Sequence, residues 1–109
     1  MWFIFPQIDG LGHSETTRYY AIKSLDEARQ YLQHPILGAR LLQCVQALLS
    51  IDGISAHEIF GSPDDLKFRS CLTLFLYATS EELFRDALAK FYDSVEDPLT
   101  LSALRADRA

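Results

Sequence analysis

The sequence predicts an all-α fold, in which five to six short helices form a single compact domain around a buried central helix at about residues 63–78. Helix start signals recur along the chain, and apolar residues between them recur at spacings of three and four. Sustained alternation of apolar and polar residues, which is typical of strands, is absent. An apolar N-terminal segment completes the prediction.

Length and composition fit one globular domain over residues 1–109. A chain of 109 residues matches the roughly 100–200 residues of a typical domain. The hydrophobic fraction of 49% and the charged fraction of 23% are those of ordinary globular proteins. With 12% aromatic residues, the chain can bury enough apolar surface to offset its ordering entropy, which argues against disorder.

The charge balance excludes several classes of partner. Fifteen acidic and ten basic residues leave a net charge of −5, so we expect no nucleic-acid binding and no electrostatic attachment to anionic lipid. No apolar run reaches the roughly 20 residues that span a bilayer, so no membrane partner is expected. The N-terminus lacks the features of a signal peptide, which predicts a cytoplasmic protein.

The first half of the chain predicts two helices. Ser24 and Glu27 form a capping box, and the helix that follows ends at His34, because a residue before proline avoids helical geometry. Pro35 suits the first position of the next helix, which stops at the turn Asp52–Gly53. That second helix carries an apolar face: Leu37, Leu41, Val45 and Leu48.

The middle of the chain predicts a short helix followed by the buried central helix. A capping box at Ser55–Glu58 opens a helix of one or two turns that closes near Gly61. Ser62 then provides an N-cap, Pro63 takes the first helical position, and Asp64–Asp65 complement the helix dipole. The second half of this helix is apolar all round, which indicates burial.

Two further helices are predicted towards the C-terminus. Thr79–Glu82 reads as a third capping box, followed by an amphipathic helix. Asp97–Pro98 begins a last short helix, and the tail after Arg105 is expected to fray.

The densest polar segment lies at the start of the central helix. Free N–H groups there, together with Lys67 and Arg69, could hold an anion. Asp64 and Asp65 would repel a phosphate at close range and suit a divalent cation or acid–base chemistry better. The alternative is a well-capped helix with a surface pair between Asp64 and Lys67.

No metal site or cofactor site is predicted. The histidines lack ligand spacing, and His34 and His57 lie where helix capping explains them. Gly10–Gly12 precedes Glu15, where a dinucleotide-binding turn would have its third glycine, so we interpret this segment as a glycine loop. Cys44 and Cys71 fall inside predicted helices and are expected to be inert thiols: neither belongs to a CxxC pair.

Several short motifs occur in order along nearly the whole chain: Trp2–Gln7, Gly10–Gly12, Ser14, His34–Pro35, Leu37–Gly38, Ile59–Phe68, Ser70 and Thr73–Phe75. Together they resemble an uncharacterised bacterial family of unknown function whose members are often labelled calpastatin. The resemblance implies a small all-α protein. The label implies calpain inhibition, but calpastatin inhibits through disordered repeats, unlike this aromatic-rich chain.

The chain departs from that family at its start. Family members carry a further helical segment before the region of Trp2, so we expect this domain to lack an N-terminal helix that the family has. The apolar run Met1–Pro6 supports this expectation, because chain ends are usually polar. The alternative is an apolar arm that packs into its own core. Cys71 and Leu72 stand where the family tends to have Ser and Met, which we interpret as a packing variation.

A weaker similarity concerns predicted N-glycosidases that act on ribosylated or nucleotide substrates. Gln33–Leu37 with the leucines after it, and then Ile59–Gly61, are similar to the helix pair and following segment of that family. The acidic catalytic positions of the family do not map cleanly onto this chain. The similarity implies a ligand related to a nucleotide.

Three hypotheses for function follow. The first is a small-ligand-binding domain or enzyme for a nucleotide- or ADP-ribose-like molecule, with Asp64 and Asp65 as catalytic groups. The second is a protein-interaction module or homodimer that uses the apolar N-terminal segment without catalysis. The third is that the motifs specify the fold only. The first hypothesis assigns these residues to ligand binding: Trp2, Phe5, Gln7, Gly12, Ser14, His34, Arg40, Ser62, Lys67 and Ser70.

Overall fold

A computed structural model describes residues 22, 24–62 and 64–108 of the chain. Their regular elements are helices, which confirms the all-α prediction. In chain order these are α2 (Leu25–Gln33), α3 (Leu37–Leu49), α4 (Ala56–Phe60), α5 (Asp64–Ala78), α6 (Glu82–Tyr92) and α7 (Pro98–Arg108). None of the helices described combines the length and the apolar content needed to cross a bilayer.

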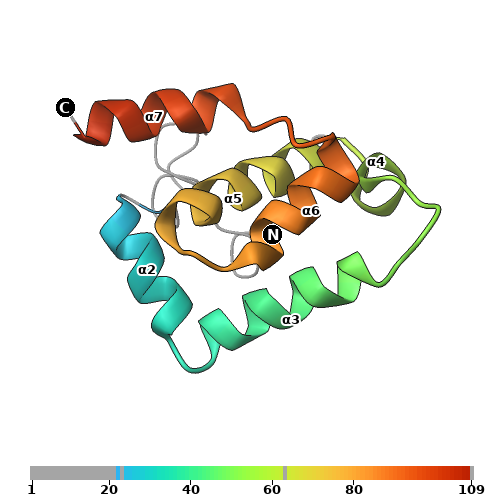
Figure 1. Cartoon of the computed structure of the whole chain (residues 1–109), viewed down its shortest axis with the longest axis horizontal. Helices are drawn as coiled ribbons and strands as arrows, with labels where there is room; N and C mark the ends of the chain where they lie inside the picture. Colours follow the sequence, from blue (N-terminus) through green and yellow to red (C-terminus); the bar gives the residue numbers. More distant parts are fainter. Residues whose placement is uncertain (1–21, 23, 63, 109) are drawn as a thin grey trace.

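Helix α5 lies at the centre of the fold, as the sequence predicts. It contacts α2, α4, α6 and α7, and Figure 1 shows it crossing the middle of the molecule. Residues all round its axis are buried: Phe68, Ser70, Cys71, Leu72, Thr73, Leu74, Phe75 and Ala78. A helix that is apolar on every side requires partners on every side, and these four helices supply them.

Aromatic rings from neighbouring helices converge on α5. Phe75 stacks on Phe84 of α6, with ring centroids 5.4 Å apart, and meets Tyr31 of α2 at 5.8 Å. Near the other end of α5, Phe68 packs against Phe60 of α4 at 5.1 Å and Tyr92 of α6 at 6.3 Å. Offset and tilted ring pairs of this kind add to the stabilisation that comes from area burial alone.

Three of the predicted helix starts are confirmed, at Ser24, Ser55 and Asp97. The Ser24 hydroxyl accepts a hydrogen bond from the Glu27 N–H at 3.1 Å. Ser55 and Glu58 form both bonds of a capping box, at 3.1 and 3.3 Å. Asp97 caps α7 by accepting from the Thr100 N–H at 2.9 Å.

The predicted capping box at Thr79–Glu82 is wrong. Helix α5 extends to Ala78, and the Thr79 N–H still donates to the Phe75 carbonyl at 3.1 Å. The Thr79 hydroxyl therefore accepts from Glu81, at 3.4 Å, within a turn between the two helices. Helix α6 begins only at Glu82, and its N-cap Glu81 makes no side-chain capping bond.

Three further helix boundaries differ from the prediction. Helix α3 begins at Leu37, beyond Pro35, because the His34 ring caps it by accepting from the Ile36 and Leu37 N–H groups at 3.1 Å. It ends at Leu49, ahead of the predicted turn. Helix α7 continues to Arg108, past the point where fraying was expected.

Helices α2 and α3 approach each other closely at Gly38. A Cβ atom at this position would lie 1.9 Å from the Leu32 carbonyl oxygen of α2. Gly38 is buried, and only hydrogen fits in the space between the two backbones. The angle between α2 and α3 therefore depends on this glycine.

Ionisation of Tyr31 makes the free energy of unfolding depend on pH in the alkaline range. Burial of its hydroxyl, with a smaller contribution from Cys71, raises the pKa of Tyr31 to about 12 from an ordinary value of 10.0. The unfolded chain loses this proton first as the pH rises. The stabilisation that comes from the raised pKa of Tyr31 is therefore fully present below pH 10 and is lost as the pH rises towards 12.

We expect the free energy of unfolding to fall between pH 10 and pH 12. In Tyr31→Phe, this fall should be smaller by about 1 kcal/mol. That figure allows for solvent screening, because the Tyr31 ring is only half-buried. Urea unfolding at a series of pH values measures this. Burial also raises the pKa of Tyr92, so the variant should keep part of the fall. Identical pH profiles for the two proteins would contradict the assignment.

Candidate functional site

The N-terminal end of α5 gathers part of the predicted site. Lys67 Nζ lies 3.8 Å from Asp64 Oδ1, which is the surface pair that the sequence allowed as an alternative. Asp65 Oδ2 lies 3.3 Å from His57 Nδ1 on α4, and Asp65 Oδ1 accepts from the Leu66 N–H at 2.9 Å. Ser62 lies just before the helix and is exposed.

His57 is a contact of Asp65 that the sequence did not reveal. Its side chain is 68% exposed, whereas that of Asp65 is 17% exposed. A pair whose imidazole is this exposed contributes little to stability. Tyr92 of α6 contacts the same residue from the protein interior, where its hydroxyl donates to the Asp65 backbone carbonyl.

Ser70 points into the protein interior, away from Asp64 and Asp65. Its hydroxyl lies 3.1 Å from both the Leu66 carbonyl and Asp97 Oδ2, and it can donate its one proton to either oxygen. Ser70 and Asp97 are 7% and 5% exposed. In the part of the chain that the structure describes, Ser70 therefore belongs to a contact between α5 and the start of α7.

Asp97 is the centre of that contact. Its Oδ2 accepts from the Thr100 hydroxyl at 2.6 Å as well as from the Thr100 N–H, and its own N–H donates to the Thr73 hydroxyl at 2.9 Å. Arg69 Nη2 approaches Asp97 Oδ1 at 3.4 Å. Within the described ranges the buried Arg69 Nε has no hydrogen-bond partner, so the guanidinium meets the carboxylate through one nitrogen only.

His34 lies at the turn between α2 and α3, and Arg40 lies in the first turn of α3. Figure 1 places this turn and α4 at opposite ends of the molecule, so the two residues do not join Asp64 and Asp65 in one site. The His34 ring nitrogen Nδ1 caps α3. Arg40 is exposed near Tyr31, where its charge offsets part of the rise in the pKa of the tyrosine.

The remaining predicted ligand-binding residues lie outside the described residues: Trp2, Phe5, Gln7, Gly12 and Ser14.

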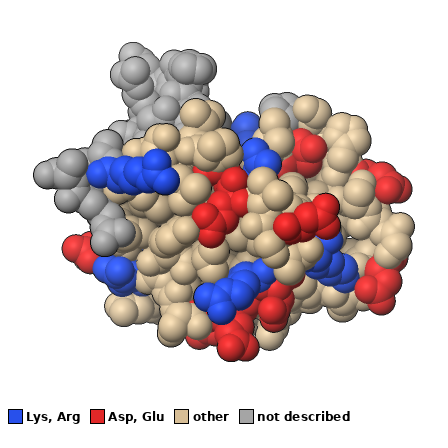
Figure 2. Space-filling view, turned by 45° about the horizontal axis from the view of Figure 1, so that its top comes forward, with Lys and Arg blue, Asp and Glu red and all other residues tan. Residues whose placement is uncertain are grey.

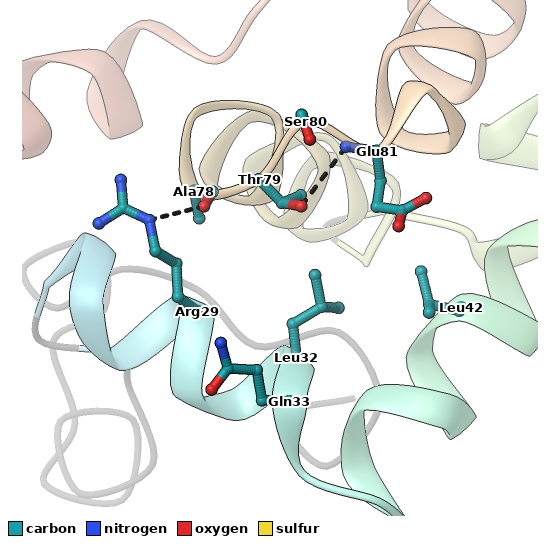
Figure 3. A pocket seen from close by; sticks show the side chains of 8 residues that line it. All are labelled: Arg29, Leu32, Gln33, Leu42, Ala78, Thr79, Ser80 and Glu81. Atoms are coloured by element: carbon teal, nitrogen blue, oxygen red, sulfur yellow. Dashed lines mark hydrogen bonds between the residues drawn. The ribbon is translucent and has the colours of Figure 1, made fainter.

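A cavity of about 450 Å³ opens between α2, α3 and the connection from α5 to α6. Figure 3 shows the α2 side chains on one side of it, Leu42 of α3 on another, and the α5–α6 connection opposite. Its lining residues combine apolar and polar groups: Arg29, Leu32, Gln33, Leu42, Ala78, Thr79, Ser80 and Glu81. We call this space the interhelical cavity.

Two side chains of opposite charge line the interhelical cavity. Arg29 is fixed in place, because its Nε donates to the Ala78 carbonyl at 2.8 Å and its Nη1 to Asp26 Oδ1 at 2.9 Å. Glu81 lies across the cavity, and its carboxylate extends towards Leu42 in Figure 3. Leu32 and Leu42 provide apolar surface between these charges.

None of the polar residues that line this cavity was predicted from the sequence as a binding residue. Arg29 and Gln33 lie on α2, and charged and amide side chains are ordinary on the solvent face of a helix. Thr79 and Glu81 were assigned to a helix start. A predicted helix start at Glu82, where α6 begins, would have left residues 79–81 as a polar connection. Such connections are common positions for binding residues.

A second cavity, of about 220 Å³, lies between α2, α5 and α7. The Tyr77 hydroxyl donates there to Glu96, with oxygens at 2.8 and 3.0 Å, and this hydrogen bond raises the pKa of Tyr77. The volume falls below the roughly 300 Å³ at which small-molecule pockets begin. The interhelical cavity is therefore the better candidate.

Two further kinds of site, a metal centre and a reactive thiol, were considered over residues 22, 24–62 and 64–108. No group of three His, Cys, Asp or Glu side chains in these ranges could hold a metal ion. Burial raises the pKa of the Cys71 thiol well above its ordinary value, which disfavours the reactive thiolate. On the face shown in Figure 2, basic and acidic side chains are interspersed over the described part of the chain.

Comparison with known proteins agrees with this fold. The family described as "Protein of unknown function (DUF1810)" matches residues 1–104. The crystal structure, at 1.38 Å, of the conserved hypothetical protein Rv1873 from Mycobacterium tuberculosis is similar, with a TM-score of 0.92 and 48% sequence identity. That match covers 95% of this chain and 75% of the mycobacterial chain. None of the curated proteins matches significantly. The resemblance to an uncharacterised all-α family is thereby confirmed, and the chain belongs to the DUF1810 family.

Proposed function

We propose that this chain is a small-ligand-binding domain that takes a nucleotide- or ADP-ribose-like molecule in the interhelical cavity. The observation that carries the proposal is the composition of this cavity. Its volume of about 450 Å³ lies within the range of roughly 300–1,000 Å³ typical of ligand pockets. It also joins apolar surface to a few polar groups that can fix the orientation of a ligand.

The lining residues match the three parts of a nucleotide. Leu32 and Leu42 offer apolar surface to a base. The Arg29 guanidinium has N–H groups left over for a phosphate oxygen, because arginine carries five such donors. The Glu81 carboxylate can accept hydrogen bonds from ribose hydroxyls, as acidic residues do in dinucleotide sites.

Thermal unfolding with adenosine, AMP and ADP-ribose tests the proposal. A ligand present at about 100 times its dissociation constant stabilises the folded state by about 2.7 kcal/mol, which raises the melting temperature by on the order of 10 °C. We expect Ser80→Trp to abolish this rise, because a large ring at the cavity rim would occupy the binding space.

Ser102→Trp is the matched control. Ser102 is exposed on α7 and does not line the cavity, so the same substitution there should leave the rise unchanged. The absence of any rise with all three ligands would overturn the proposal. An equal rise in Ser80→Trp would show that binding occurs elsewhere, which also overturns it.

A further inference from the structure

We infer that the interhelical cavity favours nucleotides whose base carries a positive charge, as in the pyridinium nucleotides, and that Glu81 provides this preference. The inference rests on the proposed function, because it concerns the ligand class of the same cavity. A pyridinium dinucleotide contains an ADP-ribose unit, so this class lies within the one already proposed. Three features carry the inference: the placement of charge across the cavity, the availability of the Glu81 carboxylate and the apolar surface towards which it extends.

Opposite charges stand on opposite sides of the cavity. Arg29 lies on α2, and Glu81 lies on the connection between α5 and α6 that faces it (Figure 3). The guanidinium uses N–H groups on the Ala78 carbonyl and on Asp26, and arginine has five such donors, so others remain for a ligand phosphate. A ligand that spans the cavity therefore meets a cation on one side and a carboxylate on the other. A nucleotide matches this order when its phosphate is negative and its base is positive.

The Glu81 carboxylate is available to such a ligand. Glu81 is the N-cap residue of α6, but its side chain makes no capping hydrogen bond. Within residues 22, 24–62 and 64–108, the carboxylate has no ion-pair partner either. An ionised carboxylate attracts a nearby positive charge, whereas to a neutral base it offers only hydrogen-bond acceptors.

The Glu81 carboxylate extends towards apolar surface. In Figure 3 it extends towards Leu42, and both residues line the cavity together with Leu32. A pyridinium ring combines an apolar face with a delocalised positive charge. It would therefore gain from contact with Leu42 and from the carboxylate at the same time. A neutral ring of similar shape would gain the apolar contact alone, so the cavity distinguishes bases by their charge.

Isothermal titration calorimetry with nicotinamide mononucleotide and its reduced form, at constant ionic strength, tests this inference. The two ligands share the phosphate, the ribose and the carboxamide, but the ring is a cation only in the oxidised form. We expect the oxidised form to bind about 5-fold more tightly, which is the scale of one ion pair at a site open to solvent.

Glu81→Gln is the test variant, because it preserves the size of the side chain and removes its charge. The affinities for the two forms should then differ by less than about 2-fold. Glu82→Gln is the matched control, since it makes the same change in net charge at the next residue, which does not line the cavity. The net charge of −5 by itself favours the less negative ligand, so only a difference between these variants reports on Glu81.

The control should keep a preference of about 5-fold for the oxidised form. Both substituted residues are exposed, and circular dichroism should show the same helix content in the two variants.

The outcomes separate the two proposals. Equal affinities of the unmodified chain for the two forms would overturn the charge preference, as would binding of AMP without binding of either form, and both results leave the proposed function standing. Equal effects of Glu81→Gln and Glu82→Gln would overturn the role of Glu81. No binding of either form, of AMP or of ADP-ribose would overturn the proposed function itself.

Discussion

Replacement of Asp97 by alanine is expected to lower the free energy of unfolding by about 3–5 kcal/mol, because it leaves buried polar partners without their acceptor. The Asp97 carboxylate accepts hydrogen bonds from Ser70 and Thr100 and pairs with Arg69. It is also the N-cap of α7, and the loss of such a cap costs about 1 kcal/mol by itself. The melting temperature should fall by on the order of 15 °C, as measured by circular dichroism.

Asp52→Ala provides the control for this variant. The Asp52 side chain is 95% exposed and pairs with Lys90 at 3.2 Å, so its loss should cost no more than about 0.5 kcal/mol. Asp97→Asn should fall between the two, because the amide oxygen can still accept from Thr100 while the charge facing Arg69 is lost. Similar melting temperatures for the two alanine variants would show that the buried contact does not stabilise the fold.

Gly38→Ala should destabilise the protein by about 3 kcal/mol or more, which is a large effect for one methyl group. The new Cβ would lie 1.9 Å from the Leu32 carbonyl oxygen and 2.6 Å from its carbon, so one backbone must move. Moving α2 away from α3 would also displace Leu32 and Leu42, which line the interhelical cavity. Urea unfolding measures the loss of stability.

Gly53→Ala separates this clash from the general effect of adding a side chain to a glycine. Gly53 has a φ of 78° and nothing within 4 Å of the position where a Cβ would lie. The substitution should therefore cost only the backbone strain, about 1 kcal/mol. Equal losses at the two glycines would mean that the close approach of α2 and α3 relaxes freely.

Helix starts were predictable from sequence where they depend on neighbouring residues alone. The Ser55–Glu58 box closes within one turn, so its residue types suffice to identify it. Thr79–Glu82 has the same pattern, but Thr79 directly follows α5, and its N–H still donates to the carbonyl of Phe75 in that helix. Arg29 of α2 donates to the carbonyl of Ala78, across 49 residues, at the point where α5 ends. The boundary between α5 and α6 therefore depends on packing between distant segments, which the local sequence pattern does not indicate.

The candidate site depends still more on distant contacts. Ser70 looked available for a ligand because its partner Asp97 lies 27 residues further along the chain. His57 and Asp65 came together because α4 turns back onto α5, which their spacing did not indicate. The interhelical cavity exists only where three segments meet, and its residues carry no motif that a sequence could display.

Arg29 holds two positions that no other side chain could hold together. One nitrogen of its guanidinium donates to the carbonyl of Ala78, the last residue of α5, and another donates to Asp26. A lysine has a single nitrogen at the end of a flexible stem, so it would have to leave the Ala78 carbonyl in order to meet a ligand. In the proposed function, the planar fork of arginine would let one side chain bind a ligand while it keeps its hydrogen bond to the end of the central helix.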